Sequence, residues 1–175
     1  MRRAAIALSA RKLLRSERGA AIIELAMVAP VFALMTIGIV DMSNAYSRKL
    51  GLEQGAQRAI EKIMQTTQDN TVDDTLISEA VCQVNGTNAD GGCKSSPITT
   101  SDVTVEHRLE CIDPSGTLHV STDPTATCTG TQKTRTYISV TVHDKYTPMF
   151  PIHFAALDST DHTYHLSATA GMRTN

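Results

Sequence analysis

The sequence predicts an α+β protein in which a long N-terminal helix packs on a small antiparallel sheet of three or four strands, a pilin-like arrangement. The first observation is an apolar run of about 21 residues from Ala20 to Val40, in which Glu24 is the one ionisable side chain. The second is a helical spacing of apolar residues that continues to about Gln65. The third is a set of alternating polar and apolar segments in the second half of the chain.

Basic residues gather before the apolar run, because six of the sixteen Lys and Arg side chains lie in residues 1–19, where only Glu17 opposes them. A helix of about 21 residues spans the ~30 Å hydrocarbon core of a bilayer. Because basic residues favour the cytoplasmic side, the chain then divides into three parts. We expect a cytoplasmic leader at 1–19, a long helix at 20–65 with its transmembrane half at 20–40, and an extracytoplasmic head at 66–175.

The helix beyond the apolar run is predicted to be amphipathic, with a proline kink inside the membrane at Pro30. Gly51, Gly55 and Ala59 stand four residues apart, and each glycine costs a helix up to ~1 kcal/mol relative to alanine. Close packing against this strip of small residues would compensate for that cost, whereas a short break near Gly51 is the alternative. The apolar positions that recur at helical steps are Met42, Tyr46, Leu50, Ala56, Ile60, Ile63 and Met64.

The head is predicted to contain one short helix followed by strands. The helix covers 72–84, with Asp73 and Asp74 in its first turn, where carboxylates suit the helix dipole. Residues 85–92 have the composition of a loop. Alternating patterns then predict strands at 103–111, 118–121, 137–146 and 164–173. In the first of these, the apolar positions point inward and Thr104, Glu106, Arg108 and Glu110 form the wet face; Ile138, Val140 and Val142 point inward in the third.

The four cysteines lie in the part of the chain that we expect to be exported. An even number of cysteines in an oxidising compartment indicates two disulfides, for which the sequence permits three connectivities. We favour the local pairs Cys82 with Cys93 and Cys111 with Cys128. Each pair closes a loop rich in Gly, Asn, Asp or Pro that cannot pack by itself.

Charge and motifs exclude several classes of function. Residues 20–175 hold ten basic and seventeen acidic side chains, so the exported part is acidic and nucleic acid is not an expected partner. The chain has no nucleophile elbow and no glycine-rich phosphate loop, which predicts a protein that is not an enzyme and needs no cofactor.

The histidines near the C-terminal end suggest a metal site that the spacing disfavours. Asp158, Asp161, His162 and His165 are close in sequence, but His162 and His165 fall on opposite faces if the segment is a strand. We therefore expect no metal site there. The loop Asn88-Ala89-Asp90-Gly91 lacks the remaining ligands of a calcium loop, and we interpret the glycosylation sequon at Asn85 as a turn.

The opening stretch resembles a known processing site. Arg18-Gly19, followed by four small or apolar residues and Glu24, is similar to the prepilin-peptidase site of type IV pilins, which is cut after the glycine. The longer run Gly19-Ala20-Ala21-Ile22-Ile23-Glu24-Leu25-Ala26-Met27-Val28-Ala29-Pro30-Val31 resembles the TadE-like pseudopilins of tight adherence (Tad or Flp) pilus systems. So do Gly38-Ile39-Val40-Asp41, Ala45-Tyr46 and the closing Ala168-Thr169-Ala170-Gly171-Met172-Arg173.

The resemblance, which is strong over roughly residues 18–64, implies a function in pilus assembly. It implies a bacterial inner-membrane protein whose leader is removed between Gly19 and Ala20 by a prepilin peptidase. The implied partners are other pilin or pseudopilin subunits and the inner-membrane assembly platform, with a possible place in the extracellular pilus. Leu25 stands where such pilins often carry an aromatic residue, which favours a minor subunit over the main fibre subunit.

Glu24 has a physical reason to be important. It lies about 6 Å along the helix from Ala20, and an acidic group inside a membrane helix costs up to ~3 kcal/mol unless it finds a partner. The ammonium group that cleavage creates on Ala20 is the expected partner, in the same chain or in a neighbour. The family resemblance implies that this pairing sets the register of subunits during assembly, whereas a carboxylate that merely reaches the interface is the alternative.

Two other functions compete with a role in a pilus. One is a permanently anchored periplasmic scaffold or binding module. The other is a secreted soluble protein cut after Ala45, because Ser43-Asn44-Ala45 places small residues where signal peptidase reads them. The apolar run is longer than the 7 to 15 residues of a usual signal core and contains an acid near its start, which disfavours secretion.

Overall fold

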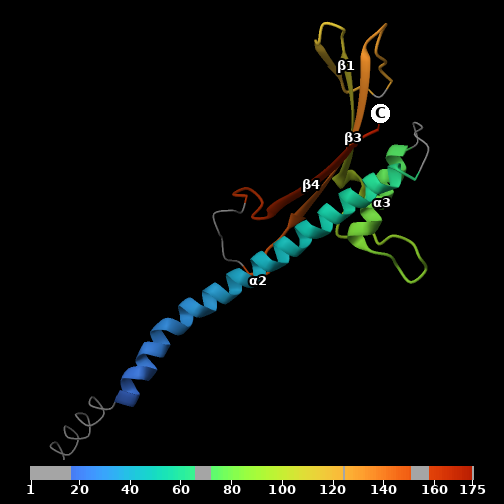
Figure 1. Cartoon of the computed structure of the whole chain (residues 1–175). Helices are drawn as coiled ribbons and strands as arrows, with labels where there is room; N and C mark the ends of the chain where they lie inside the picture. Colours follow the sequence, from blue (N-terminus) through green and yellow to red (C-terminus); the bar gives the residue numbers. More distant parts are fainter. Residues whose placement is uncertain (1–16, 66–71, 124, 151–157, 175) are drawn as a thin grey trace, which may run out of the picture. The chain divides into compact units, whose positions relative to one another are not determined.

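The computed structural model describes residues 17–65, 72–123, 125–150 and 158–174. The chain forms two compact units, Met1–Ser43 and Asn44–Asn175, and helix α2 (Glu17–Ile63) contributes to both. The second unit continues with α3 (Val72–Asn85), a 3-10 turn (Thr100–Asp102) and four strands (Figure 1). The strands are β1 (Val103–Ile112), β2 (Leu118–Ser121), β3 (Lys133–Tyr146) and β4 (Tyr164–Arg173). The predicted α+β class is confirmed.

The first half of α2 is apolar on all sides. Ile22, Leu25, Met27 and Phe32 are 63% to 74% exposed, and the helix is long and apolar enough to cross a membrane. Exposed apolar side chains around a whole helix are typical of a membrane span, because water would disfavour them. Pro30 lies inside α2, and the helix continues on both sides of it.

The second half of α2 buries only part of the predicted apolar pattern. Its buried apolar side chains are spaced by three, four or seven residues and are Ala45, Leu52, Ala56, Ala59 and Ile63. The predicted positions Ala56 and Ile63 are thus confirmed, and Ile60 packs against the core. Four of the predicted apolar positions, Met42, Tyr46, Leu50 and Met64, are instead 40% to 75% exposed. The prediction was wrong for these four residues because close packing selects the face with the smaller side chains, which leaves the longer ones outside.

The sheet is antiparallel throughout, with the strand order β2-β1-β3-β4. β4 pairs with β3 from Tyr137 opposite Arg173 to Tyr146 opposite Tyr164. β1, β2 and β4 lie within one residue of their predicted bounds, but β3 begins at Lys133 rather than Tyr137. The polar residues 133–136 join the strand because they pair with Leu109–Ile112 of β1, a contact that their own pattern does not encode.

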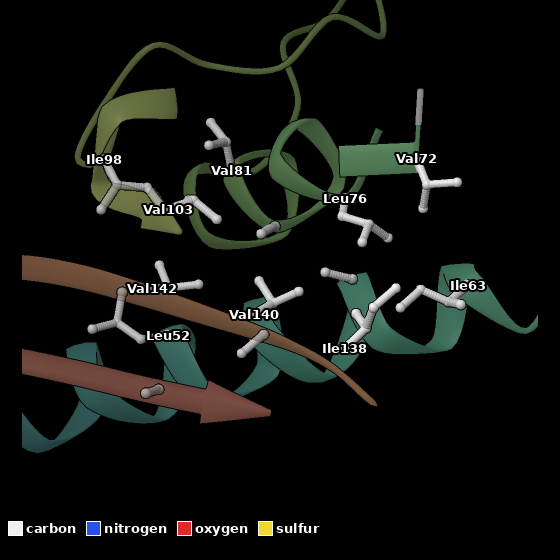
Figure 2. Packing of buried hydrophobic residues seen from close by; sticks show 14 residues of the cluster. Leu52, Ile63, Val72, Leu76, Val81, Ile98, Val103, Ile138, Val140 and Val142 are labelled. Atoms are coloured by element: carbon white, nitrogen blue, oxygen red, sulfur yellow. The ribbon is translucent and has the colours of Figure 1, made fainter. Parts of the chain in front are cut away.

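The core lies between one face of the sheet and the two helices, as Figure 2 shows. Ile138, Val140 and Val142 of β3 point into it, which confirms their predicted direction. Leu52 of α2, Leu76 of α3 and Ile98 are also fully buried there. The side chains that alternate with these on the strands point away from the helices, so the sheet has an outer face.

One residue of the predicted wet face is buried. Glu110 on β1 is only 8% exposed, and its carboxylate lies 2.6 Å from Nη2 of Arg108 on the same strand. The alternating pattern places Glu110 on the outer side of the sheet, but the pattern does not show that Arg108 lies over it.

Both disulfides join the predicted partners. Cys82 bonds to Cys93 with a Cα–Cα distance of 4.8 Å, and Cys111 bonds to Cys128 with a Cα–Cα distance of 5.5 Å. The first closes the loop that follows α3, and the second ties β1 to the segment between β2 and β3. The predicted local connectivity is confirmed.

Asn85 is the last residue of α3 rather than the first of a loop, and its side chain is buried. Its Nδ2 donates to the carbonyl oxygens of Lys94 at 2.8 Å and Ile98 at 2.7 Å. The backbone N–H of Ile98 donates to Oδ1 of Asn85 at 3.0 Å. One amide therefore holds the far end of the disulfide loop against α3 and fixes Ile98 in the core.

Candidate functional site

The predicted cleavage site lies in the described part of α2, Glu17–Ile63. The backbone is helical at both Gly19 and Ala20. A peptidase that binds an extended backbone would have to unwind the helix at this bond, and Gly19 lowers the cost because glycine is a poor helix former.

Glu24 lies on α2 one turn beyond the predicted cleavage site. It is four positions after Ala20, so the two share a helix face and are about 6 Å apart along the axis. Glu24 is exposed, and its neighbours Ile23 and Leu25 are 65% and 67% exposed apolar side chains. The carboxylate is therefore presented on an apolar helix surface, where a cation would stabilise it.

The three small residues of the predicted packing strip have different surroundings. A Cβ atom added to Gly55 would lie 2.5 Å from Cγ2 of Val84 and 3.2 Å from the carbonyl oxygen of Ala80, so α2 and α3 approach closely at Gly55. Ala59 is fully buried in the core. Gly51 has open space around the position of a Cβ, and α2 continues through it without a break.

Ion pairs connect the helices to the sheet within the second unit. Arg48 of α2 lies 3.0 Å from the carboxylate of Asp144, whose side chain on β3 is 6% exposed. Arg58 of α2 pairs with Glu79 of α3 at 3.0 Å. The first pair links α2 to the sheet and the second links the two helices, and Arg48 neutralises a carboxylate that burial would otherwise destabilise.

A third pair joins α3 to β1 directly. Nε2 of His107 lies 2.8 Å from Oδ1 of Asp73, one of the two acids in the first turn of α3. The histidine side chain is 22% exposed and the aspartate 43%, so the contact sits at the rim of the core. The alternation along β1 places His107 on the side of the helices but does not predict this polar link to α3.

The structure brings together three of the four residues that suggested a metal site. Carboxylate oxygens of Asp158 and Asp161 and a ring nitrogen of His165 lie within 4.8 Å of one another. Oδ2 of Asp161 is 2.8 Å from Nε2 of His165 and also accepts from Nζ of Lys145 at 3.0 Å. His162 lies in the preceding turn with a φ of 55°. Because Lys145 already supplies a cation, the geometry is that of an ion-pair network.

Hydrogen bonds keep the Asp161 carboxylate ionised. The pKa of Asp161 is lowered chiefly by its hydrogen bond with His165, and next by those from Thr163 and Lys145. The pKa of Asp113 is lowered in the same way by hydrogen bonds with Gln132 and His119. Both carboxylates belong to turns that precede or follow strands, so they support local structure rather than a reactive centre.

The comparison with protein families identifies the opening helix. Residues 19–60 match the family model of TadE-like proteins, which confirms the resemblance carried by this stretch. The match begins at Gly19 and ends inside α2, so it covers the helix and not the sheet of the head. No curated protein and no solved structure matched the chain.

Proposed function

Because residues 19–60 match the TadE-like family, we propose that this chain is a pseudopilin or minor pilin that takes part in the assembly of a tight adherence (Flp-type) pilus. TadE-like proteins have a structural, pseudopilin-type role in Tad pilus systems and are not enzymes. The single observation that carries the proposal is that the match starts at Gly19, the residue before the scissile bond that the sequence motif predicts.

The proposed topology follows from charge, hydropathy and the disulfides. The basic leader 1–19 lies in the cytoplasm, the first half of α2 spans the bacterial inner membrane, and the head faces the oxidising side. The basic flank of the apolar run and the exposed apolar surface of α2 support this orientation. In this position the chain meets the prepilin peptidase, other pilin subunits and the assembly platform.

A substitution at the scissile bond tests the processing step. In cells that contain the peptidase, the mature wild-type chain should begin at Ala20, whereas Gly19→Val should keep its leader because a branched side chain shields the bond. Intact mass spectrometry of the purified chain measures the difference. The control is Gly51→Ala, a glycine of the same helix with open space around it, which should be processed like the wild type.

The mature mass also separates the competing functions. A wild-type chain that begins at Met1 would support a permanently anchored scaffold or binding module, and one that begins at Tyr46 would support a secreted protein. Either result would contradict the proposed pilin-type processing.

The role of Glu24 is tested after processing. Pairing between Glu24 and the Ala20 ammonium sets the position of the subunit relative to its neighbours, so Glu24→Ala should be cleaved normally but incorporated poorly. Incorporation is measured by immunoblotting the assembled pilus fraction and its membrane-bound complexes. Glu53→Ala, which removes an acid from the part of α2 outside the apolar run, is the matched control. Normal incorporation of the Glu24→Ala chain would remove Glu24 from the assembly mechanism.

A further inference from the structure

The outer face of the sheet has a charge opposite to that of the rest of the head. Residues 44–175 contain ten Lys and Arg and fifteen Asp and Glu. The outer sheet face, defined as the strand side chains that point away from the helices, holds five of the basic residues but only two acids, Glu106 and Glu110. The remainder of the head keeps five basic and thirteen acidic residues. The five basic residues of this face are Arg108, Lys133, Arg135, Lys145 and Arg173.

The strand register places an aromatic ring between two of these cations. Arg108 of β1 lies opposite Tyr137 of β3, which in turn lies opposite Arg173 of β4. The next row contains Ser139 and Gly171, and the lack of a side chain at Gly171 leaves a groove of about 340 Å³ beside the ring. A side chain at Gly171 would crowd the carbonyl oxygen of Ile138 at 3.2 Å, so the groove is built into the sheet.

Exposed aliphatic side chains of β2 extend the same face at the edge of the sheet. Val120 pairs with Glu110 and Leu118 pairs with Ile112, so both β2 residues share the outer face. They are 51% and 49% exposed. Tyr and Arg beside exposed aliphatic residues are the composition of a protein interface, in which Tyr and Arg supply much of the binding free energy.

Charge indicates which protein surface fits. Two outer sheet faces would repel each other, because each keeps an excess of positive charge even after Asp161 offsets Lys145. The rest of the same head offers the complementary charge, and Asp74, Asp90 and Asp123 are exposed there. We propose that the outer sheet face of one copy docks on the carboxylate-rich remainder of the head of a second copy. The proposal rests on the proposed function only in that assembly gathers copies in one membrane.

The proposed contact is heterologous, because the two partners use different surfaces. A heterologous contact leaves one free surface of each kind on a pair, so further copies can add. The interaction should depend on salt, since exposed charges supply much of the attraction. Association through the apolar half of α2 would depend neither on salt nor on residues of the sheet.

Sedimentation equilibrium of the purified full chain in detergent micelles tests the proposal. The association constant should fall about tenfold or more between about 50 mM and about 500 mM NaCl. The pair Lys133→Glu and Arg173→Glu should lower it by about tenfold at low salt, and the pair Leu118→Ser and Val120→Ser by several-fold. The control pair Lys49→Glu and Lys94→Glu makes the same change in net charge at exposed positions outside the outer sheet face, so its association should stay at wild-type strength or increase.

Three results would overturn the interface: a chain that remains monomeric, association that neither salt nor the outer-face variants weaken, or equal loss in the control pair. Circular dichroism identifies any variant that has unfolded, and the salt series on the wild type stands without variants. A chain processed after Gly19 that stays monomeric would refute the interface and leave the proposed function intact. A chain that self-associates as predicted but keeps its leader would support the interface and contradict the proposed function.

Discussion

Asn85 shows how much one buried amide contributes at the scale of a residue. Asn85→Ala removes three hydrogen bonds and leaves the carbonyls of Lys94 and Ile98 and the N–H of Ile98 without this partner. Because unpaired buried groups are costly, the free energy of unfolding should fall by about 2 to 4 kcal/mol. Urea unfolding of the oxidised chain measures the loss.

Asn88→Ala is the matched control for this prediction. Asn88 is exposed, and its side chain makes one long hydrogen bond of 3.4 Å to the carbonyl of Cys93. Its removal should change the free energy of unfolding by less than about 0.5 kcal/mol. Equal effects at the two asparagines would mean that the Asn85 network does not hold the loop.

Residues differ in how far their roles follow from sequence. Gly19 and Glu24 are predicted from a local motif, because a cleavage site and a charge in an apolar helix depend on near neighbours in the chain. Asn85 is followed by Gly86, so its local pattern indicates a turn, and its burial depends on Lys94 and Ile98. Contacts of that kind follow from the tertiary fold and not from composition.

At the scale of elements, the crossing of α2 and α3 depends on the absence of a side chain at Gly55. Gly55→Ala should lower the free energy of unfolding by about 1 to 2 kcal/mol, because the added methyl group meets Val84 and the carbonyl of Ala80. Gly51→Ala should instead raise it by up to about 1 kcal/mol, since alanine favours the helix and the space is open. Thermal unfolding of the two variants measures both changes in stability. A stabilised Gly55→Ala chain would contradict the close packing.

The elements themselves were largely predictable, whereas the surfaces they bury were less so. Alternation of polar and apolar residues predicts β1 and β4 because each has one buried and one exposed face. The same type of reasoning chose Ala56 and Ile63 correctly on α2 but also chose Tyr46 and Leu50, which are more hydrophobic than the alanines that pack. Periodicity measures hydrophobicity, but close packing also depends on size and on the partner.

At the scale of the whole molecule, the acidic head should lose stability in acid. Hydrogen bonds with His165, Thr163 and Lys145 lower the pKa of Asp161, and similar bonds lower the pKa values of Asp113, Asp123 and Asp158. Because these values lie below those of the unfolded chain, the unfolded state binds more protons in acid. The stabilisation is complete above about pH 5 and should decline as the pH falls below it.

Urea unfolding at a series of pH values checks this direction. Asp161→Asn removes one of the four titrating groups, so the variant should be less stable at neutral pH and should lose less stability on acidification than the wild type. An equal pH dependence in the two chains would contradict the prediction, because it would mean that folding does not lower the pKa of Asp161.

The long distance in sequence between α2 and β4 has a consequence for the order of events during synthesis. Leu52 and Ala168 belong to the same core cluster, although more than 100 residues separate them. In the topology proposed above, the apolar half of α2 would leave the ribosome early and enter the membrane first, whereas the core that includes its second half would stay incomplete until β4 had been exported. Nascent chains of that topology would remain anchored and incompletely folded, and accessible to chaperones and proteases, until the last strand joined the sheet.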